Sequence, residues 1–83
     1  MGEIKFDIRV INDKGSPNKS CKVTVFDDAF LGTSHSSSYT NSDGWASFEF
    51  YCVSGNMKIK VFIEGNFVGK TTIGNNETTS FVY

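Results

Sequence analysis

The 83-residue chain is poor in the residues that build helices. It contains one leucine, two alanines and no glutamine. Because these residues have high helix propensity, their scarcity argues against a helical domain. Val, Ile, Thr, Phe, Tyr and Trp together supply 32 of the 83 residues. These side chains suit a pleated, half-buried surface, so the composition favours β-strands.

The chain also lacks concentrated charge and long apolar runs. Its formal net charge is −1, and no basic stripe of the kind that recognises nucleic acid is present. No apolar stretch approaches the roughly 20 residues that cross a bilayer, and the N-terminus has no signal-peptide hydrophobic region. We therefore expect no nucleic-acid partner and no membrane insertion. A full-length chain of this kind would be cytoplasmic, whereas an excised domain would favour an extracellular or cell-surface origin.

Histidine is nearly absent, which restricts the available chemistry. His35 is the one histidine, and it lies in a polar segment, residues 27–36, that is expected to be a loop. Catalysis by a cysteine–histidine pair requires an exposed thiolate beside the imidazole. A zinc site needs several Cys or His ligands at short spacing, and no such spacing occurs. The sequence predicts no enzyme, no metal site and no cofactor, with His35 as a solvated side chain.

Alternation of apolar and polar residues is the main structural signal. In residues 3–11, Ile4, Phe6, Ile8 and Val10 share one face, and charged residues share the other. Similar runs are separated by turn residues, among them the hairpin signal Asp43-Gly44. The expected strands are 3–11, 20–26, 37–41, 45–53, 57–64, 67–73 and 78–83. Short strands at regular spacing are typical of sandwiches, so residues 1–83 are predicted to form one all-β domain. This domain would be a single antiparallel β-sandwich, immunoglobulin-like or transthyretin-like.

The order of turn glycines and core residues resembles a known family. The relevant segments are Gly15-Ser16-Pro17, Val23-Thr24-Val25, residues 40–48 (TNSDGWASF), Gly55, and residues 58–65 (KIKVFIEG). The pattern is similar to that of the carboxypeptidase regulatory-like domains and their transthyretin-like (prealbumin-like) relatives. This resemblance implies a β-sandwich that serves as a non-catalytic accessory or cell-surface module, although a shared fold does not by itself supply a function.

Two activities of related domains are not expected here. The hydroxyisourate hydrolases resemble this fold but end in a Tyr-Arg-Gly-Ser tail and use several histidines, whereas this chain ends in Ser-Phe-Val-Tyr. Related adhesin domains form Lys–Asn isopeptide bonds. The last expected strand, 78–83, contains neither Asn nor Asp, so such a bond is not expected.

The two cysteines, Cys21 and Cys52, both point inward by alternation. A disulfide between them would close a loop of about 30 residues and contribute roughly 3–4 kcal/mol in an oxidising compartment. The alternative is a pair of reduced thiols packed as small hydrophobic side chains.

Outward-facing aromatic residues are the first candidates for binding. Alternation places Trp45, Tyr51 and Phe62 on outer faces of strands that are neighbours in sequence. A row of exposed aromatic rings on one sheet could stack on sugar rings or anchor a protein partner. Alternatively, such rings pair across strands and only stabilise the sheet.

The segment 27–36 is the second candidate, because Phe30 and Leu31 form an apolar patch within a polar loop. In an up-and-down arrangement, the turns at 54–56 and 74–77 lie at the same end of the molecule. Sandwich folds often bind through such end loops, although Phe30 or Leu31 could equally plug the end of the core. The acidic residues at this end match no defined calcium loop.

The sequence thus predicts a non-catalytic binding or accessory module that recognises a protein or a glycan. Its candidate binding residues are Trp45, Tyr51, Phe62, Phe30 and Leu31. The alternative is a structural spacer or stalk domain of a larger cell-surface or extracellular assembly.

Overall fold

The strands of the computed structural model coincide in number and order with those expected from alternation. The model describes residues 2–28, 34–52 and 55–83, and within these ranges it contains seven strands. They are β1 (Gly2–Ile11), β2 (Lys22–Asp27), β3 (His35–Tyr39), β4 (Trp45–Cys52), β5 (Asn56–Ile63), β6 (Asn66–Gly74) and β7 (Glu77–Val82). The part of the chain that is described holds no helix with the length and hydropathy of a membrane span.

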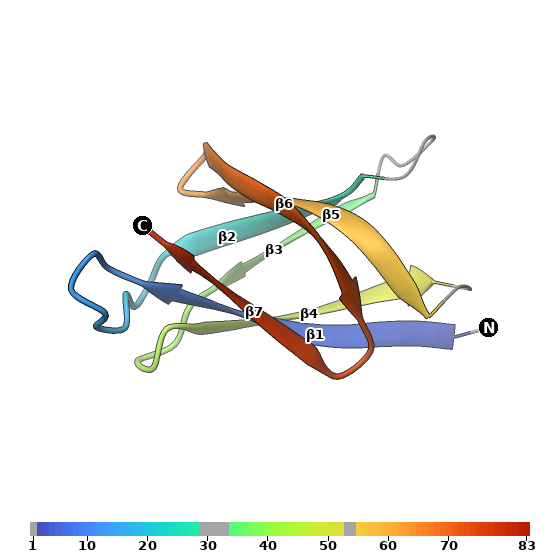
Figure 1. The fold of residues 1–83 in the computed structure, drawn as a ribbon, viewed down its shortest axis with the longest axis horizontal. Coiled ribbons are helices and arrows are strands. Elements are labelled where there is room, and N and C mark those ends of the chain that lie inside the picture. The colour runs from blue at the N-terminus through green and yellow to red at the C-terminus, as the bar shows by residue number, and fades with distance from the viewer. Residues whose placement is uncertain (1, 29–33, 53–54) are drawn as a thin grey trace.

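The strands form two packed sheets, a three-stranded sheet with the order β4-β1-β7 and a four-stranded sheet with the order β3-β2-β5-β6 (Figure 1). The predicted all-β sandwich is therefore confirmed. One feature departs from the expected antiparallel arrangement, because β7 pairs with β1 in parallel. The three-stranded sheet is mixed, and the chain begins and ends on neighbouring strands.

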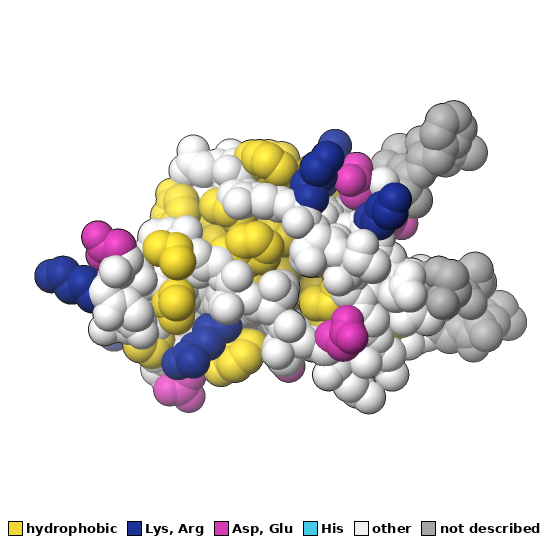
Figure 2. All heavy atoms as spheres, viewed as in Figure 1, with side chains coloured by type: hydrophobic (Ala, Val, Ile, Leu, Met, Phe, Trp, Pro, Cys, Tyr) yellow, Lys and Arg dark blue, Asp and Glu magenta, His cyan; other side chains and the backbone are white. Residues whose placement is uncertain are grey.

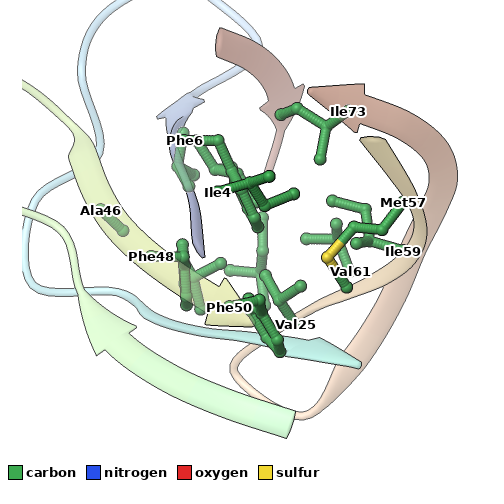
Figure 3. Close-up of a cluster of buried hydrophobic side chains, with 14 of the residues drawn as sticks. Ile4, Phe6, Val25, Ala46, Phe48, Phe50, Met57, Ile59, Val61 and Ile73 are labelled. Atoms are coloured by element: carbon green, nitrogen blue, oxygen red, sulfur yellow. The ribbon is translucent and has the colours of Figure 1, made fainter. Parts of the chain in front are cut away.

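The alternation decides which side chains fill the space between the sheets. Figure 3 shows Phe6, Phe48 and Phe50 of the three-stranded sheet pointing toward Val25, Ile59 and Val61 of the four-stranded sheet. The Phe6 ring stacks against both of its aromatic neighbours on β4, with ring centroids 5.7 Å from Phe48 and 5.9 Å from Phe50. Burial of these apolar surfaces is the main favourable term in the stability of such a fold.

The sequence predicts a hairpin at Asp43-Gly44, and the structure has a turn there, but it is not a hairpin because it connects β3 and β4, which lie in different sheets. The turn is anchored to the end of β1. Gly44 has a φ of +83° and accepts a hydrogen bond from the Val10 amide at 2.7 Å. A Cβ atom on Gly44 would lie 2.5 Å from the carbonyl oxygen of Val10, which itself accepts a bond from the Asn18 amide. Only glycine satisfies both the positive φ and the close backbone approach.

An irregularity in the β5–β6 pairing reorients one residue. Val61 pairs with Gly69, but the next residue, Phe62, pairs with Phe67, so that Val68 is an extra residue in β6. Such a bulge interrupts the alternation of the strand that carries it. As a result, Phe67 joins Lys70 on the outer face, although three positions separate them.

Candidate functional site

An unbroken row of aromatic rings crosses the outer face of the four-stranded sheet. His35 of β3 stacks on Phe26 of β2 with ring centroids 5.1 Å apart. Phe26 meets Phe62 of β5 edge-on at 5.4 Å, and Phe62 meets Phe67 of β6 at 5.4 Å. The four rings therefore form one contact chain with a contribution from every strand of the sheet. We call these four residues the aromatic row.

The strand register produces this row. Phe26 is directly opposite His35, and Phe62 is directly opposite Phe67. Phe26 is opposite Lys60 and Thr24 is opposite Phe62, so the two central phenylalanines are diagonal neighbours. Direct and diagonal cross-strand neighbours on one face lie within reach of aromatic side chains.

The outer part of the row is open to solvent. Phe67 is 55% exposed, whereas Phe26 and Phe62 are half-buried. Tyr39, on the same face at the far end of β3, is 65% exposed and lies opposite Lys22. This face therefore presents large apolar surface to water in the absence of a partner.

Lysine side chains border the aromatic row on one side. Lys60 and Lys70 are directly opposite each other on β5 and β6, and Lys58 lies two residues before Lys60. Like charges directly opposite each other destabilise a sheet. Asp28 offsets part of this repulsion, with a carboxylate oxygen 3.4 Å from Nζ of Lys60. We call Lys58, Lys60 and Lys70 the lysine cluster.

A shallow hollow of about 240 Å³ lies at the lysine cluster, and Asp28, Lys58, Lys70 and Thr72 are among the residues that line it. Figure 2 shows basic side chains beside β6 with an acidic side chain between them. Within the described ranges, no carboxylate forms an ion pair with Lys58 or Lys70. Both ammonium groups are therefore available to an anion from outside.

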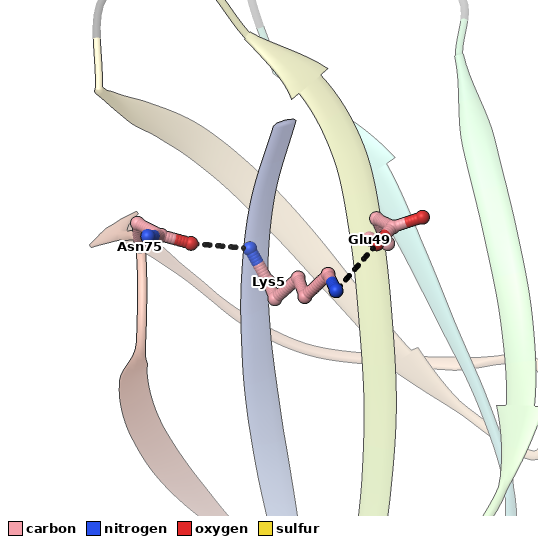
Figure 4. Close-up of polar contacts among 3 residues, drawn as sticks. All are labelled: Lys5, Glu49 and Asn75. Atoms are coloured by element: carbon pink, nitrogen blue, oxygen red, sulfur yellow. Dashed lines mark hydrogen bonds and ion pairs between the residues drawn. The ribbon is translucent and has the colours of Figure 1, made fainter. Parts of the chain in front are cut away.

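The outer face of the three-stranded sheet has a different character, because its polar side chains pair with one another. Lys5 lies 3.3 Å from Glu49, and its backbone amide donates to Oδ1 of Asn75 at 2.9 Å (Figure 4). The Ser47 hydroxyl donates to Asp7 at 2.7 Å. A shallow hollow of about 550 Å³ lies over these pairs. Most of the charged and polar side chains that line it are already paired with each other by the ion pair and the hydrogen bond just described.

Two carboxylates on this face influence each other's protonation. The hydrogen bond with Glu49 and the negative charge of Glu49 raise the pKa of Glu3 above its ordinary value. The same hydrogen bond and the neighbouring Lys5 lower the pKa of Glu49. Both side chains are on the surface, so this is a local feature of the face and not a buried catalytic pair.

The structure separates the aromatic residues that the sequence grouped together. Trp45 and Tyr51 lie on β4 in the three-stranded sheet, whereas Phe62 lies on β5 in the four-stranded sheet. Their outer faces point in opposite directions, so the expectation of a single row containing all three was wrong. The predicted row requires that strands adjacent in sequence are neighbours in one sheet, but β4 and β5 belong to different sheets.

Trp45 and Tyr51 are also far from each other. Six residues along one strand correspond to roughly 20 Å. The guanidinium of Arg9 covers the Trp45 ring at 5.6 Å from its centroid, while Tyr51 is 67% exposed. Phe30 and Leu31, the other two candidates, lie outside the described residues.

Sequence reasoning missed three members of the aromatic row, namely Phe26, Phe67 and His35. Alternation in β2 predicts that Phe26 faces outward, because Val23 and Val25 point inward and Phe26 is the next residue. The sequence predicts that His35 lies in a polar loop, but it is the first residue of β3 and its ring is stacked. For Phe67, alternation along β6 predicts an inward side chain, and the bulge turns it outward.

Of the two alternatives for the cysteines, the bridge between Cys21 and Cys52 is not formed, because Cys21 is a buried free thiol. Cys21 is held beside Thr40, next to the turn after which β4 begins, whereas Cys52 is the last residue of β4. The length of β4 alone separates the two by roughly 20 Å, far beyond the Cα separation of about 7 Å that a disulfide tolerates. Burial raises the pKa of the Cys21 thiol, with a further contribution from Glu64.

The end of the sandwich that carries Asp28 also carries the β6–β7 turn, as expected for the up-and-down strands. The Asp28 amide donates to the carbonyl of Lys58, and the Asn76 amide donates to that of Lys5. Within residues 2–28, 34–52 and 55–83, no three His, Cys, Asp or Glu side chains are grouped as metal ligands.

Comparison with known proteins extends the description of the fold. No protein-family model matches the sequence, and no curated protein matches it. The structure is similar to that of a DUF3823 family protein from Parabacteroides merdae, with a TM-score of 0.61 and 16% sequence identity. The similarity covers 98% of this chain and 45% of that protein, so this chain spans less than half of its length. At this identity the likeness shows a common β-sandwich fold.

Proposed function

We propose that this chain is a non-catalytic binding module that recognises a protein partner through the outer face of the four-stranded sheet. The observation that carries the proposal is the aromatic row, which crosses all four strands and ends at the exposed ring of Phe67. Exposed aromatic groups of this kind are enriched at the centres of protein interfaces.

Cross-strand pairing alone is a weaker account of the row. Aromatic pairs do stabilise sheets by roughly 0.2–1 kcal/mol each. However, a sheet that needed only this stabilisation would gain it from rings packed against the sheet, without an exposed phenylalanine at one end. Tyr39 on the same face is also exposed, on the far side of the Thr24–Ser37 pair from the row. A contiguous apolar surface bordered by charged residues favours a docking role.

The geometry of the rings favours a protein over a glycan. Phe26 and Phe62 are inclined at 70°, and Phe62 and Phe67 at 60°, so the rings form a ridge and not a flat platform. The nearby hydroxyls of Thr24 and Ser37 bond to each other at 2.8 Å, so they are already engaged. A glycan needs hydrogen-bonding groups directed at its hydroxyls, whereas apolar side chains of a protein pack readily against inclined rings.

The family resemblance is in keeping with this role. The pattern of turn glycines resembles the carboxypeptidase regulatory-like and transthyretin-like domains, which implies an accessory module. The sandwich likeness to a solved protein of more than twice this length supports the same idea of a module within a larger architecture.

A comparison of the two outer faces tests the proposal. The chain would be panned against a random peptide display library and applied to a glycan array, as wild type, as Phe67→Ser and as Tyr51→Ser. Both substitutions remove an exposed aromatic ring, but on opposite faces of the sandwich. Peptides that bind wild type and Tyr51→Ser but are lost with Phe67→Ser are the expected result. Ligands lost only with Tyr51→Ser would move the site to the other sheet and contradict the proposal.

The alternative function is a structural spacer, and one observation favours it. Because β1 and β7 are parallel, the two ends of the chain emerge at opposite ends of the long axis (Figure 1). The domain extends 38 Å along that axis. If neither library contains a ligand that depends on Phe67, the spacer becomes the better account.

A further inference from the structure

We infer that the partner docks an acidic, extended segment on the four-stranded sheet, with an apolar side chain on the aromatic row and carboxylates on the lysine cluster. The inference rests on the proposed function and adds the chemistry of the partner. It derives from the arrangement of charge beside the rings.

The charge on the two outer faces differs. Lys22, Lys58, Lys60 and Lys70 all lie on the outer face of the four-stranded sheet, and they are half of the eight basic residues in the chain. Asp28 pairs with Lys60 there, and the other three lysines have no ion-pair partner within the described residues. On the opposite face Lys5 has its own partner, Glu49, so the positive charges of that face are not in excess.

The lysines without an ion-pair partner favour an anionic segment, and in an unmodified protein the anionic side chains are carboxylates. Lys60 and Lys70 face each other directly, an arrangement that costs stability in the free protein. A bound carboxylate would relieve this repulsion, because it would supply the negative charge that Asp28 provides to Lys60 alone. Complementary charge at an interface also raises the association rate and excludes wrong partners.

The spacing points to a segment in extended conformation. Phe62, Lys60 and Lys58 occupy alternate positions of β5 and lie on one line along the outer face. Neighbours in this line are roughly 6.6 Å apart, which is also the distance between residues i and i+2 of an extended chain. An apolar side chain seated at Phe62 and Phe67 would therefore be followed, two and four residues along, by carboxylates at Lys60–Lys70 and at Lys58.

Charge reversal with a matched control tests this inference. A random peptide display library would be panned on wild type, on Lys58→Glu/Lys70→Glu, and on Lys14→Glu/Lys19→Glu. The control pair makes the same change in net charge in the β1–β2 connection, at the other end of the sandwich. We expect wild type and the control to enrich peptides with an apolar residue followed by acidic residues at two-residue spacing. The Lys58→Glu/Lys70→Glu protein should lose these peptides, with affinities lower by about tenfold or more at low ionic strength.

A second variant distinguishes loss of binding from loss of folding. Lys58→Gln/Lys70→Gln removes the charge without introducing repulsion from Asp28, and it should fold at least as well as wild type because the Lys60–Lys70 repulsion is gone. It too should lose the acidic peptides, and its fold is checked by circular dichroism.

The other outcomes overturn the inference in distinguishable ways. Peptides without acidic enrichment that still require Phe67 would refute the acidic partner and leave the proposed function standing. No peptide that depends on Phe67 would refute both. Binding of polygalacturonate that requires Phe67, in the absence of any such peptide, would replace the acidic protein segment with an anionic glycan.

Discussion

The ring of Phe81 lies over the backbone of Gly69 and joins the two sheets at the side where β6 and β7 form their edges. A Cβ atom placed on Gly69 would be 3.0 Å from Cε1 of Phe81, so the ring occupies the space that a side chain on β6 would fill. Phe81 and Val68 both pack against the core. Figure 2 shows hydrophobic side chains gathered between these two strands. The absence of a side chain at one position thus permits a ring from the other sheet to close the core.

Gly69→Ala should lower the free energy of unfolding by about 1 kcal/mol, because the methyl group forces the Phe81 ring outward. The same substitution in a Phe81→Ala background should be neutral or stabilising, since alanine is the better strand residue once the ring is absent. Urea denaturation of the four proteins gives the coupling energy. Equal effects in both backgrounds would show that the ring does not rest on this glycine.

Gly15 and Gly44 both have a positive φ, but their surroundings differ. Gly15 has a φ of +82° and open space around its Cβ position, whereas a Cβ on Gly44 meets the Val10 carbonyl. Gly15→Ala should therefore cost roughly 1–2 kcal/mol for the left-handed backbone alone. Gly44→Ala should cost roughly 1–3 kcal/mol more, because the turn between β3 and β4 must move away from β1. Chemical denaturation measures both, and similar losses would mean that the close approach is unimportant.

The carboxylate pair on the three-stranded sheet predicts a specific titration. Because Glu49 raises the pKa of Glu3, Glu49→Gln should bring the pKa of Glu3 back toward its ordinary value. Side-chain carboxyl NMR resonances recorded against pH in wild type and in Glu49→Gln measure this change. An unchanged titration of Glu3 in Glu49→Gln would argue against the interaction.

The two members of this pair contribute to pH-dependent stability with opposite sign. A raised pKa in the folded state means that Glu3 stabilises the fold at low pH, and this contribution is lost as the pH rises through the folded pKa. The lowered pKa of Glu49 gives a contribution that is present above its ordinary pKa and is lost as the pH falls. The two effects partly cancel, so the pair should have little influence on the midpoint of acid unfolding.

Cys21 should be unreactive in the folded protein. Burial raises its pKa, so the thiolate fraction at neutral pH is small, and its sulfur is covered by the fold. In a Cys52→Ser variant, alkylation by iodoacetamide should be slow under native conditions and fast in denaturant. The mass of the intact wild-type chain should be unchanged by reduction. Rapid native alkylation, or a mass increase of two hydrogens on reduction, would contradict these expectations.

The location of the strongly alternating strands followed from the sequence because their inward series are unambiguous. In β1 a shift of one residue would place charged side chains such as Lys5 and Arg9 in the core, so only one orientation of the strand is stable. The same holds for β5, where Met57, Ile59 and Val61 alternate with exposed or half-exposed residues. Alternation therefore determined the inner face of each strand correctly in these cases.

Pairing between strands did not follow from alternation, because the pattern within a strand contains no information about its neighbours. Trp45 and Phe62 both face outward, yet they belong to different sheets. The bulge opposite Phe62 is a second feature that alternation does not predict. Counting back by two from buried Ile73 would place Phe67 inside, and only the extra residue Val68 turns it outward. The aromatic row depends on both pairing and bulge, so it became visible only in three dimensions.

The parallel pairing of β1 and β7 determines how the domain would respond to force. If the chain is pulled at Gly2 and Tyr83, the load runs along both strands in opposite directions, and the hydrogen bonds between them bear it in shear. Bonds loaded in this way must break together, whereas bonds at the end of a hairpin open one after another. The additional bond from the Tyr83 amide to the carbonyl of Ile11 lies at the end of the same ladder and shares the load. A domain held at its two ends would therefore resist extension until the β1–β7 ladder fails as a unit.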